Sequence, residues 1–402
     1  MAGHPEPRTE QELLGDLVGQ LDTATPYELV EVCQAWLARR VGARWSGLLL
    51  VDYSQTVLEP VPGRGSGTSP GRPHTVADGP AGTAYREQRV VRDPAPAGTE
   101  QSPDPGEVVV YVPVTVRTER LGVLMVAVAQ LTPAVTELLS DAARVLAHVL
   151  VVARRYTDRF EMLRRRKDLG LAAEIQWELL PVLAYELPAF SIAGALEPTY
   201  DIGGDTFDYA VSATRLTITV TDAVGHGLRA ALLGSLAVTA MRNLRRRGED
   251  ICAQAAAANQ HLVEQFPGAE FVTGLLLEID APTGSARLLN AGHPAPLLLR
   301  DGLVETVQLP PDLPLGLDRA TVYQEHTLPL RSGDRLLLLT DGITEAHHRG
   351  APPFGTPHVK QLLTSLAHLP PAEFVRHLTR AVLDHRGGDL ADDATAVCLD
   401  WH

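Results

Sequence analysis

An unbroken run of leucines, 336–339, is followed directly by Thr340, Asp341 and Gly342. An apolar run of this length is typical of a buried strand. The run stops at a carboxylate and then at glycine, the residue best suited to a tight turn. We therefore predict that Asp341 lies at the end of a buried strand, where its carboxylate is placed to hold a ligand.

A second strand of this design lies upstream, and two more acidic pairs accompany it. The alternating segment 216–221 is typical of a strand and ends in Asp222-Ala-Val-Gly-His-Gly227. The remaining carboxylates are Asp205 and Asp208 in a Gly-Gly-Asp-Thr-Phe-Asp sequence, and Asp392 and Asp393 just before the last apolar strand. Because Mg²⁺ and Mn²⁺ prefer oxygen ligands, these loop carboxylates at strand ends predict a site for a hard divalent cation.

Composition limits the kind of protein in which such a site would occur. With 402 residues, of which 45% are hydrophobic, the chain is long enough for two or three globular domains. Its net charge of −14 argues against binding to nucleic acid or to an anionic membrane. The three cysteines are far apart, the N-terminus has no signal-peptide pattern, and no apolar run reaches the roughly 18 residues that a membrane span needs. We therefore expect a cytoplasmic protein without disulfides or a zinc site.

The first third of the chain, residues 10–150, is expected to form a separate domain. A helix, a strand, a loop region rich in proline and glycine, two more strands and a long helix follow one another. This order, with the segment 79–93 in its middle, resembles a GAF domain, an α/β module. The resemblance implies a role in sensing a small molecule or in packing into a dimer. A purely structural domain is the alternative, because no arrangement of cysteines or histidines here identifies a ligand.

The helix that closes this domain is predicted to continue beyond it. Apolar residues recur at intervals of three and four in a heptad pattern: Leu139, Ala142, Leu146, Val149, Ala153, Tyr156, Phe160 and Leu163. Such a seam is typical of a parallel coiled coil between two protomers. Residues 151–185 are therefore interpreted as a helical, coiled-coil linker that makes the protein a homodimer. The alternative is a single helix packed against its own domain.

Residues 186–402 are expected to be rich in antiparallel strands. Asp301-Gly302 joins two short apolar segments, which is a strong signal for a β-hairpin. The helical segments come in groups rather than alternating with strands: 228–247 with 250–266, and 357–369 with 372–385. Hairpins and grouped helices predict an α+β fold with an antiparallel core.

Five motifs of this region occur in the order and approximate spacing of one family. They are Gly203-Gly-Asp-Thr-Phe-Asp208, Asp222-Ala-Val-Gly-His-Gly227, Asn290-Ala-Gly-His-Pro294, Leu339-Thr-Asp-Gly-Ile-Thr-Glu345 and Asp392-Asp-Ala-Thr395. From about residue 176 to 401 the chain thereby resembles the sporulation stage II protein E (SpoIIE) branch of the metal-dependent (PPM, type 2C) serine/threonine phosphatases. The resemblance implies an antiparallel β-sandwich flanked by helices (α-β-β-α), two Mn²⁺ or Mg²⁺ ions, and hydrolysis of phosphoserine or phosphothreonine. The implied substrate is a phosphorylated regulatory protein, typically an anti-sigma-factor antagonist.

The resemblance also assigns metal ligands. Asp222 looks like the carboxylate that bridges both metals. Asp341 and Asp392 look like ligands of one metal, while Asp205 and the backbone carbonyl of Ala223 look like ligands of the other. Many relatives have glycine where this chain has Ala223, but a carbonyl ligand does not need a missing side chain.

Each of four polar residues near these ligands in the sequence has two possible roles. Asp208 and Asp393, the second members of their pairs, are either outer-shell partners of the ligands or ordinary loop acids. His226 lies between two glycines and is either the catalytic acid that protonates the departing serine or threonine oxygen, or part of the start of a helix. His293 either shapes a turn near the site or contacts the substrate.

Two rival functions compete with this interpretation. The Gly-Gly-Asp-Thr-Phe sequence is also similar to the signature of GGDEF nucleotide cyclases, but the later motifs fit a phosphatase. The second rival is a catalytically silent phosphatase fold that serves as a binding scaffold regulated by a ligand of the GAF-like domain. Retention of all the candidate ligands argues against it. The sequence thus favours a phosphatase with a GAF-like sensor (10–150), a helical linker (151–185) and a catalytic domain (186–402).

Overall fold

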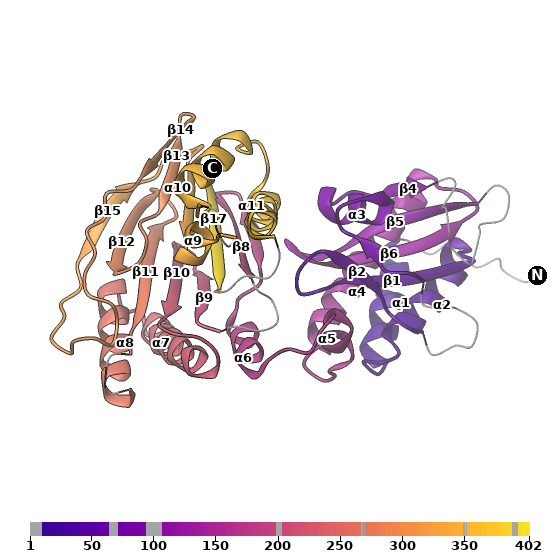
Figure 1. Ribbon diagram of the computed structural model, residues 1–402. Coiled ribbons are helices and arrows are strands. Elements are labelled where there is room, and N and C mark those ends of the chain that lie inside the picture. Colours follow the sequence, from indigo (N-terminus) through magenta and orange to yellow (C-terminus); the bar gives the residue numbers. More distant parts are fainter. Residues whose placement is uncertain are drawn as a thin grey trace, which may run out of the picture. The chain divides into compact units, whose positions relative to one another are not determined.

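A computed structural model describes residues 10–63, 71–93, 107–197, 203–266, 268, 270–348, 350, 352–387 and 393–402. The chain divides into two compact units, Met1–Lys167 and Asp168–His402, shown with their elements in Figure 1. This boundary falls inside the range 151–185 for which a linker was expected. None of the helices in the described ranges combines the length and the apolar character that crossing a membrane requires.

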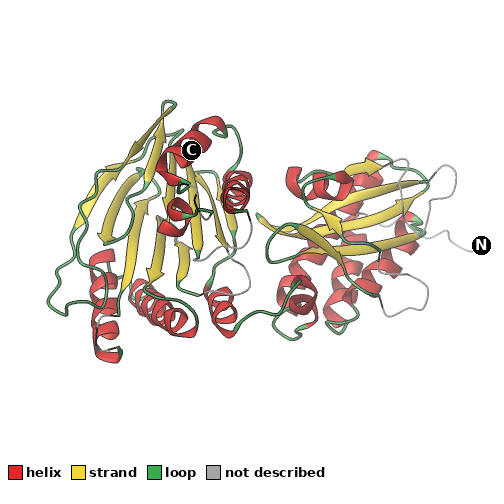
Figure 2. Ribbon diagram, in the orientation of Figure 1, coloured by secondary structure: helices red, strands yellow, loops and turns green. Residues whose placement is uncertain are grey.

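The N-terminal unit is built on an antiparallel sheet with helices on both faces (Figure 2). The strand order is β3-β2-β1-β6-β5-β4. The strands are β1 (Trp45–Val51), β2 (Val57–Pro60), β3 (His74–Thr75), β4 (Val91–Asp93), β5 (Val108–Val116) and β6 (Glu119–Val128). The helices are α1 (Glu10–Thr23), α2 (Leu29–Val41), α3 (Gly79–Glu87), α4 (Pro133–Ala153) and α5 (Arg159–Arg164).

Strand β5 shows why this sheet needs helices on both sides. Successive side chains of a strand point to opposite faces. Val110 and Val112 therefore join the core formed with α1, α2 and α4, whereas Val109 and Tyr111 join the core beneath α3. A sheet that is apolar on both faces is stable only when both faces are covered.

The expected coiled-coil helix is not formed, because its apolar residues pack inside the N-terminal unit. Helix α4 ends at Ala153, and the short helix α5 follows as a separate element. Leu146 and Phe160 are buried in the core that α4 forms with its own sheet, whereas Tyr156, also on the predicted seam, is 75% exposed. The coiled-coil prediction is wrong because the sheet face itself takes up the apolar stripe of α4. The homodimer stays a prediction, without the seam on which it was based.

We expect truncation of Leu146 to destabilise the N-terminal unit itself. The Leu146→Ala variant leaves a cavity in a packed core, which costs about 2–5 kcal/mol in the free energy of unfolding. The matched control is Val152→Ala on the same helix, where the side chain is 56% exposed and the change stays within about 0.5 kcal/mol. Denaturant unfolding followed by circular dichroism measures both. Unchanged stability combined with dissociation of a dimer would restore the coiled-coil interpretation.

The C-terminal unit consists of two antiparallel sheets packed face to face, with orders β15-β12-β11-β10-β9 and β14-β13-β16-β17-β8-β7. The strands of the first sheet are β9 (Asp205–Val211), β10 (Arg215–Ala223), β11 (Val272–Asp280), β12 (Ser285–Ala291) and β15 (Glu325–Pro329). Those of the second are β7 (Ala184–Leu187), β8 (Phe190–Glu197), β13 (Leu297–Arg300), β14 (Leu303–Thr306), β16 (Arg335–Leu339) and β17 (Ala394–Trp401). The helices are α6 (Leu171–Leu179), α7 (Leu228–Arg246), α8 (Ile251–Gln265), α9 (Asp341–Glu345), α10 (Gly355–Ser365) and α11 (Pro371–Arg386).

Three apolar layers hold this unit together. The central layer lies between the sheets and includes Ile218 of β10 and Leu338 of β16. A second layer joins β10–β12 to α7 and α8, and a third joins the other sheet to α9, α10 and α11. The predicted α+β fold, an antiparallel sandwich flanked by helices, is therefore confirmed (Figures 1 and 2).

Candidate metal centre

Asp205 and Asp222 face each other across neighbouring strands. Strand β9 begins at Asp205, and the antiparallel register pairs this residue directly with Asp222, the last residue but one of β10. Residues in such a pair project to the same side of the sheet with Cβ atoms about 4.5–5.5 Å apart. Phe207 and Val220, two positions further along, lie in the layer between the sheets. Both carboxylates therefore face the second sheet, at the ends of their strands.

The second sheet meets this pair through Thr340, which follows β16. Its hydroxyl Oγ1 donates to Asp205 Oδ2 at 2.6 Å and accepts from the backbone N of Thr395, on β17, at 2.9 Å. Because the Thr395 N–H occupies the acceptor side of the hydroxyl, the hydroxyl proton is directed at Asp205. Thr340 is fully buried and immediately precedes Asp341, the first residue of α9. The leucine strand thus places Asp341 directly after the threonine that contacts Asp205.

A third carboxylate, Asp393, contacts the backbone of Asp205. Its Oδ2 accepts hydrogen bonds from the backbone N of Asp205 at 3.1 Å and from Nε2 of Gln176 at 2.9 Å. The same Nε2 donates to the backbone carbonyl of Asp205 at 2.7 Å. Gln176, on α6, is buried. Asp393 thereby fixes the backbone from which Asp205 projects, as an outer-shell partner would.

The Asp341–Gly342 turn packs tightly against Asp393. A Cβ atom on Gly342 would lie 1.7 Å from the backbone oxygen of Asp393, so only glycine fits there. Asp392, the remaining candidate ligand, lies outside the described residues. Within the described ranges, no three His, Cys, Asp or Glu side chains are grouped closely enough to hold a metal ion.

The electrostatics of the pair nevertheless suit a cation. Burial raises the pKa of Asp205 well above its usual value, and the neighbouring charges of Asp222 and Asp393 raise this pKa further. The hydrogen bond from Thr340 opposes the shift only in part. A nearby cation stabilises the charged form of a carboxylate whose pKa is raised in this way, and carboxylate oxygens are the donors that Mg²⁺ or Mn²⁺ prefers.

Ala223 and His226 continue the chain beyond β10. The side chain of Ala223 is buried in the layer beneath α7, and its backbone N donates to the Gly204 carbonyl at 3.2 Å. His226 is exposed in the turn between Gly225 and Gly227, whose φ angles of +89° and +72° favour glycine. The structure therefore leaves the imidazole accessible at the loop that follows Asp222.

His293, in the turn that follows β12, contacts the strand next to Asp222. Its Nδ1 lies 2.8 Å from Oγ1 of Thr273, and Thr273 pairs in register with Asp222. The backbone N of His293 donates to Oδ1 of Asn290, and the backbone O accepts from Nδ2 of Asn290. Burial lowers the pKa of His293 to about 4, so the ring is neutral at pH 7. These contacts agree with a role in shaping the turn after β12, one of the two interpretations given for His293.

Asp208 does not belong to the centre. It lies within β9 rather than in a loop, and it pairs with Arg242 and Arg245 of α7, each at 2.7 Å between a guanidinium nitrogen and a carboxylate oxygen. Position 208 has the opposite parity to Asp205 along the strand, so its side chain points to the helices. The prediction that Asp208 is a loop carboxylate is wrong, and its contacts exclude the outer-shell interpretation.

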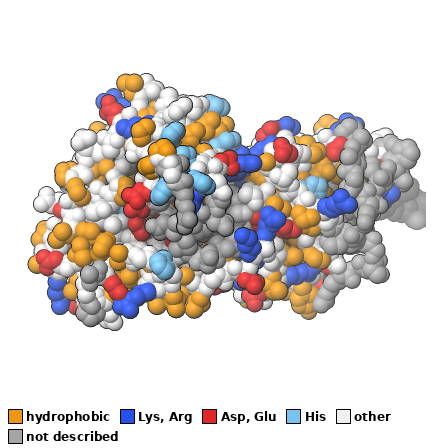
Figure 3. Space-filling model, in the orientation of Figure 1, with side chains coloured by type: hydrophobic (Ala, Val, Ile, Leu, Met, Phe, Trp, Pro, Cys, Tyr) orange, Lys and Arg blue, Asp and Glu red, His pale blue; other side chains and the backbone are white. Residues whose placement is uncertain are grey.

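Histidines elsewhere do not make a second centre. Figure 3 shows histidine side chains gathered on one face of the C-terminal unit. The rings of His358 and His385 lie 6.0 Å apart, and both His347 and His348 are exposed. No group of three potential ligands forms there among the residues that the structure describes.

Two polar residues of the centre, Gln176 and Thr340, were not given a role from the sequence. Gln176 occurs on the face of α6 that also buries Ala172 and Ala173. A polar residue on the apolar face of a helix is a usable signal, because a buried amide requires partners. Thr340 carries no comparable signal, since a threonine at a strand end is common in any sheet.

Comparisons with known proteins bear on the same region. Residues 212–402 match the family described as Stage II sporulation protein E (SpoIIE). The phosphoserine phosphatase RsbU of Bacillus subtilis (strain 168) is 22% identical over 236 residues, covering 58% of this chain and 70% of that protein. The phosphoserine phosphatase RsbP of the same organism is 26% identical over 190 residues, covering 46% of each chain. This chain therefore spans just under half the length of RsbP.

A solved structure, the SiaA-PP2C domain of Pseudomonas aeruginosa, is 22% identical with a TM-score of 0.49, covering 57% of this chain and 94% of that one. The family match begins at residue 212, so it includes Asp222 but not Asp205. The structural support for Asp205 therefore comes from its register pairing with Asp222 and not from the family match.

Replacement of Asp208 is expected to reduce stability. In Asp208→Asn, two guanidinium groups lose the carboxylate that they share in a largely buried site, which costs about 3–5 kcal/mol in the free energy of unfolding. The control Asp301→Asn changes an exposed turn residue and stays within about 0.5 kcal/mol. Denaturant unfolding at pH 7 compares the two variants. Equal stability would show that the ion pairs contribute nothing.

The buried neutral state of His293 predicts an acid-dependent loss of stability. The pKa of His293 falls from 6.5 to about 4 on folding. Between these two pH values the imidazole is therefore protonated in the unfolded chain and neutral in the folded chain. Stability should therefore decrease as the pH falls from 6.5 towards about 4. In His293→Gln this component is removed, whereas in His347→Gln, at an exposed position, it remains. Unfolding free energies measured at several pH values test the difference, and equal slopes for the two variants contradict it.

Proposed function

We propose that this chain is a metal-dependent phosphatase acting on phosphoserine or phosphothreonine in a regulatory protein, because residues 212–402 match the SpoIIE family. The observation that carries the proposal is the register pairing of Asp205 with Asp222, opposite Thr340 and Asp393 of the other sheet. A buried carboxylate whose pKa is raised by neighbouring carboxylates is more often found at a functional site than elsewhere in a fold, which supports a metal-binding role for Asp205.

The proposed ligands of two Mn²⁺ or Mg²⁺ ions are Asp205, Asp222, Asp341, Asp392 and the carbonyl of Ala223. When bound, such ions polarise a phosphoryl oxygen and lower the pKa of water near it. No described cationic side chain is among the main influences on the pKa of Asp205, which favours ions as the missing positive charge.

The chain's own residues have separate tasks in this proposal. Thr340 and Asp393 hold Asp205 in place through its side chain and its backbone. His226, exposed beyond the end of β10, is proposed to donate a proton to the serine or threonine oxygen as that oxygen departs. His293 is neutral and acts by positioning the turn that follows β12.

The substrate is proposed to be a phosphorylated regulatory protein of the anti-sigma-factor antagonist type. The motif resemblance favours this class, and two relatives are named phosphoserine phosphatases. The N-terminal unit is proposed to be a GAF-like domain that controls hydrolysis. Its antiparallel sheet with helices on both faces supports that assignment.

Replacing Asp222 tests the metal mechanism. Asp222→Asn keeps the shape of the side chain but removes the charge proposed to be shared by two cations. Because metal ions contribute several kcal/mol to such reactions, hydrolysis of p-nitrophenyl phosphate with MnCl₂ should fall at least about a hundredfold. The control Asp301→Asn, at an exposed turn, should keep the rate of the unaltered chain.

Two results would contradict this proposal. Full activity of Asp222→Asn, or activity that survives exhaustive chelation, excludes the proposed role of the carboxylates. Failure of the unaltered chain to hydrolyse p-nitrophenyl phosphate and a phosphoserine peptide, with Mn²⁺ or Mg²⁺, instead supports the catalytically silent scaffold.

A further inference from the structure

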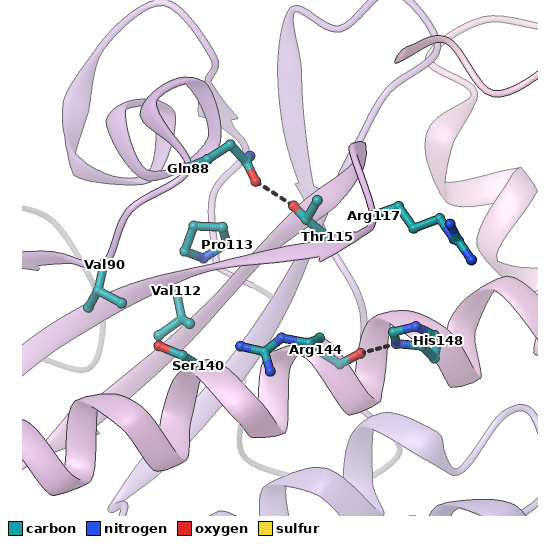
Figure 4. Close-up of a pocket in the computed structure, with 9 residues that line it drawn as sticks. All are labelled: Gln88, Val90, Val112, Pro113, Thr115, Arg117, Ser140, Arg144 and His148. Carbon is teal, nitrogen blue, oxygen red and sulfur yellow. Dashed lines mark hydrogen bonds between the residues drawn. The ribbon is translucent and has the colours of Figure 1, made fainter. Parts of the chain in front are cut away.

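A cavity of about 600 Å³ lies at one edge of the sheet in the N-terminal unit. Figure 4 shows that its walls come from three places: the segment that follows α3, the end of strand β5 with its turn, and one face of α4. Ser140, Arg144 and His148 occur at intervals of four along α4, so they line the cavity from successive turns of the helix.

The cavity exists because β4 is short. Strand β4 pairs with β5 only at Val109–Tyr111, so the rest of β5 has no partner on this side within the described residues. Pro113 occupies this uncovered edge and lacks a backbone N–H. Proline is tolerated in a sheet where its nitrogen faces away from any pairing strand, and it prevents a further strand from pairing there. The edge is therefore unsuited to an added peptide strand and is open to a small molecule.

The neutral polar groups of the cavity already have partners. Thr115 Oγ1 donates to Oε1 of Gln88 at 2.6 Å, and the amide Nε2 of Gln88 donates to the Tyr85 carbonyl at 2.7 Å. Ser140 Oγ donates to the Thr136 carbonyl at 2.8 Å. A ligand would have to compete with these hydrogen bonds to bind the same groups.

Charge and apolar surface remain as the recognition features. Val90, Val112 and Pro113 give the cavity an apolar wall, while Arg117 and Arg144 bring positive charge. None of the described residues that line the cavity is acidic. Arg144 Nη1 pairs with Asp141 Oδ1 at 2.9 Å, but the Arg144 side chain is 64% exposed. Such an exposed pair is weak, so the guanidinium can turn to a ligand at little cost.

From these features we infer that the cavity binds a small amphiphilic anion, in which an apolar body carries a carboxylate, sulfonate or phosphate group. The apolar body lies at the sheet edge that Val90, Val112 and Pro113 form (Figure 4). The positive charges of Arg117 and Arg144, one towards each end of the cavity, attract the anionic group. Because α4 supplies one wall and closes the N-terminal unit, the ligand would contact the last long helix before the chain reaches the C-terminal unit.

The test is a binding measurement on the full chain with 8-anilinonaphthalene-1-sulfonate, a probe with an apolar body and a sulfonate group. In Arg117→Glu/Arg144→Glu, the affinity measured by fluorescence titration should fall at least about tenfold, since each change replaces attraction by repulsion. The matched control is Arg72→Glu/Arg155→Glu, which makes the same change of net charge at exposed positions outside the cavity and should stay within about twofold of the unaltered chain.

A second variant and a competition keep the inference testable if the charge reversal impairs folding. Ser140→Trp fills the cavity while it keeps both arginines, and it should also lose the probe. Octanoate should displace the probe from the unaltered chain at concentrations at least about tenfold lower than octanol, which has the same chain length without the charge. Equal affinities in the cavity variants and the control, or equal displacement by octanol and octanoate, would overturn the inference. The assay uses no phosphatase substrate, so its result is independent of the proposed catalytic function.

Discussion

Two carboxylates held opposite each other at the ends of adjacent strands constrain the whole C-terminal unit. Asp205 is buried, and its pKa is raised by burial and by its neighbours Asp222 and Asp393. Such an arrangement destabilises a fold unless the charges are compensated. Donors from two other segments stabilise these carboxylates: the Thr340 hydroxyl after β16 donates to Asp205, and the Gln176 amide on α6 donates to Asp393. A divalent cation, as proposed above, would add positive charge beside these carboxylates.

This constraint explains why the sandwich is built as it is. The first sheet supplies Asp205 and Asp222, and segments beside strands of the second supply Thr340 and Asp393. The candidate centre therefore requires a fixed position of one sheet relative to the other. The apolar layer between them fixes that relation, because Phe207 and Val220 beside the carboxylates pack in the same layer as Leu338. Gly342 then allows the backbone after β16 to touch Asp393. Packing of apolar side chains thereby sets the positions of the polar ones.

The N-terminal unit illustrates how one apolar pattern allows two outcomes. A stripe that recurs every three or four residues suits a partner helix and a sheet face equally well. In this unit the sheet covers the stripe: Leu139, Leu146 and Phe160 pack in the core that α4 forms with it, whereas Tyr156 is left exposed. Sequence periodicity reports that a face is apolar but not what covers it.

The strands, most helices, the antiparallel α+β class and the resemblance to the SpoIIE family could be predicted from the sequence, because they depend on local patterns. These patterns are an apolar run ending in Thr340-Asp341, hairpin turns, and five ordered motifs. The sequence also singled out Asp205 and Asp222. Only the tertiary structure separated Asp208 from that pair, since the parity of β9 and the position of α7 decide which face each aspartate occupies. It alone placed Gln176 beside Asp393, 217 residues away in the chain. Hydrogen bonds between such distant residues depend on how the sheets and helices pack, which no local pattern of residues specifies.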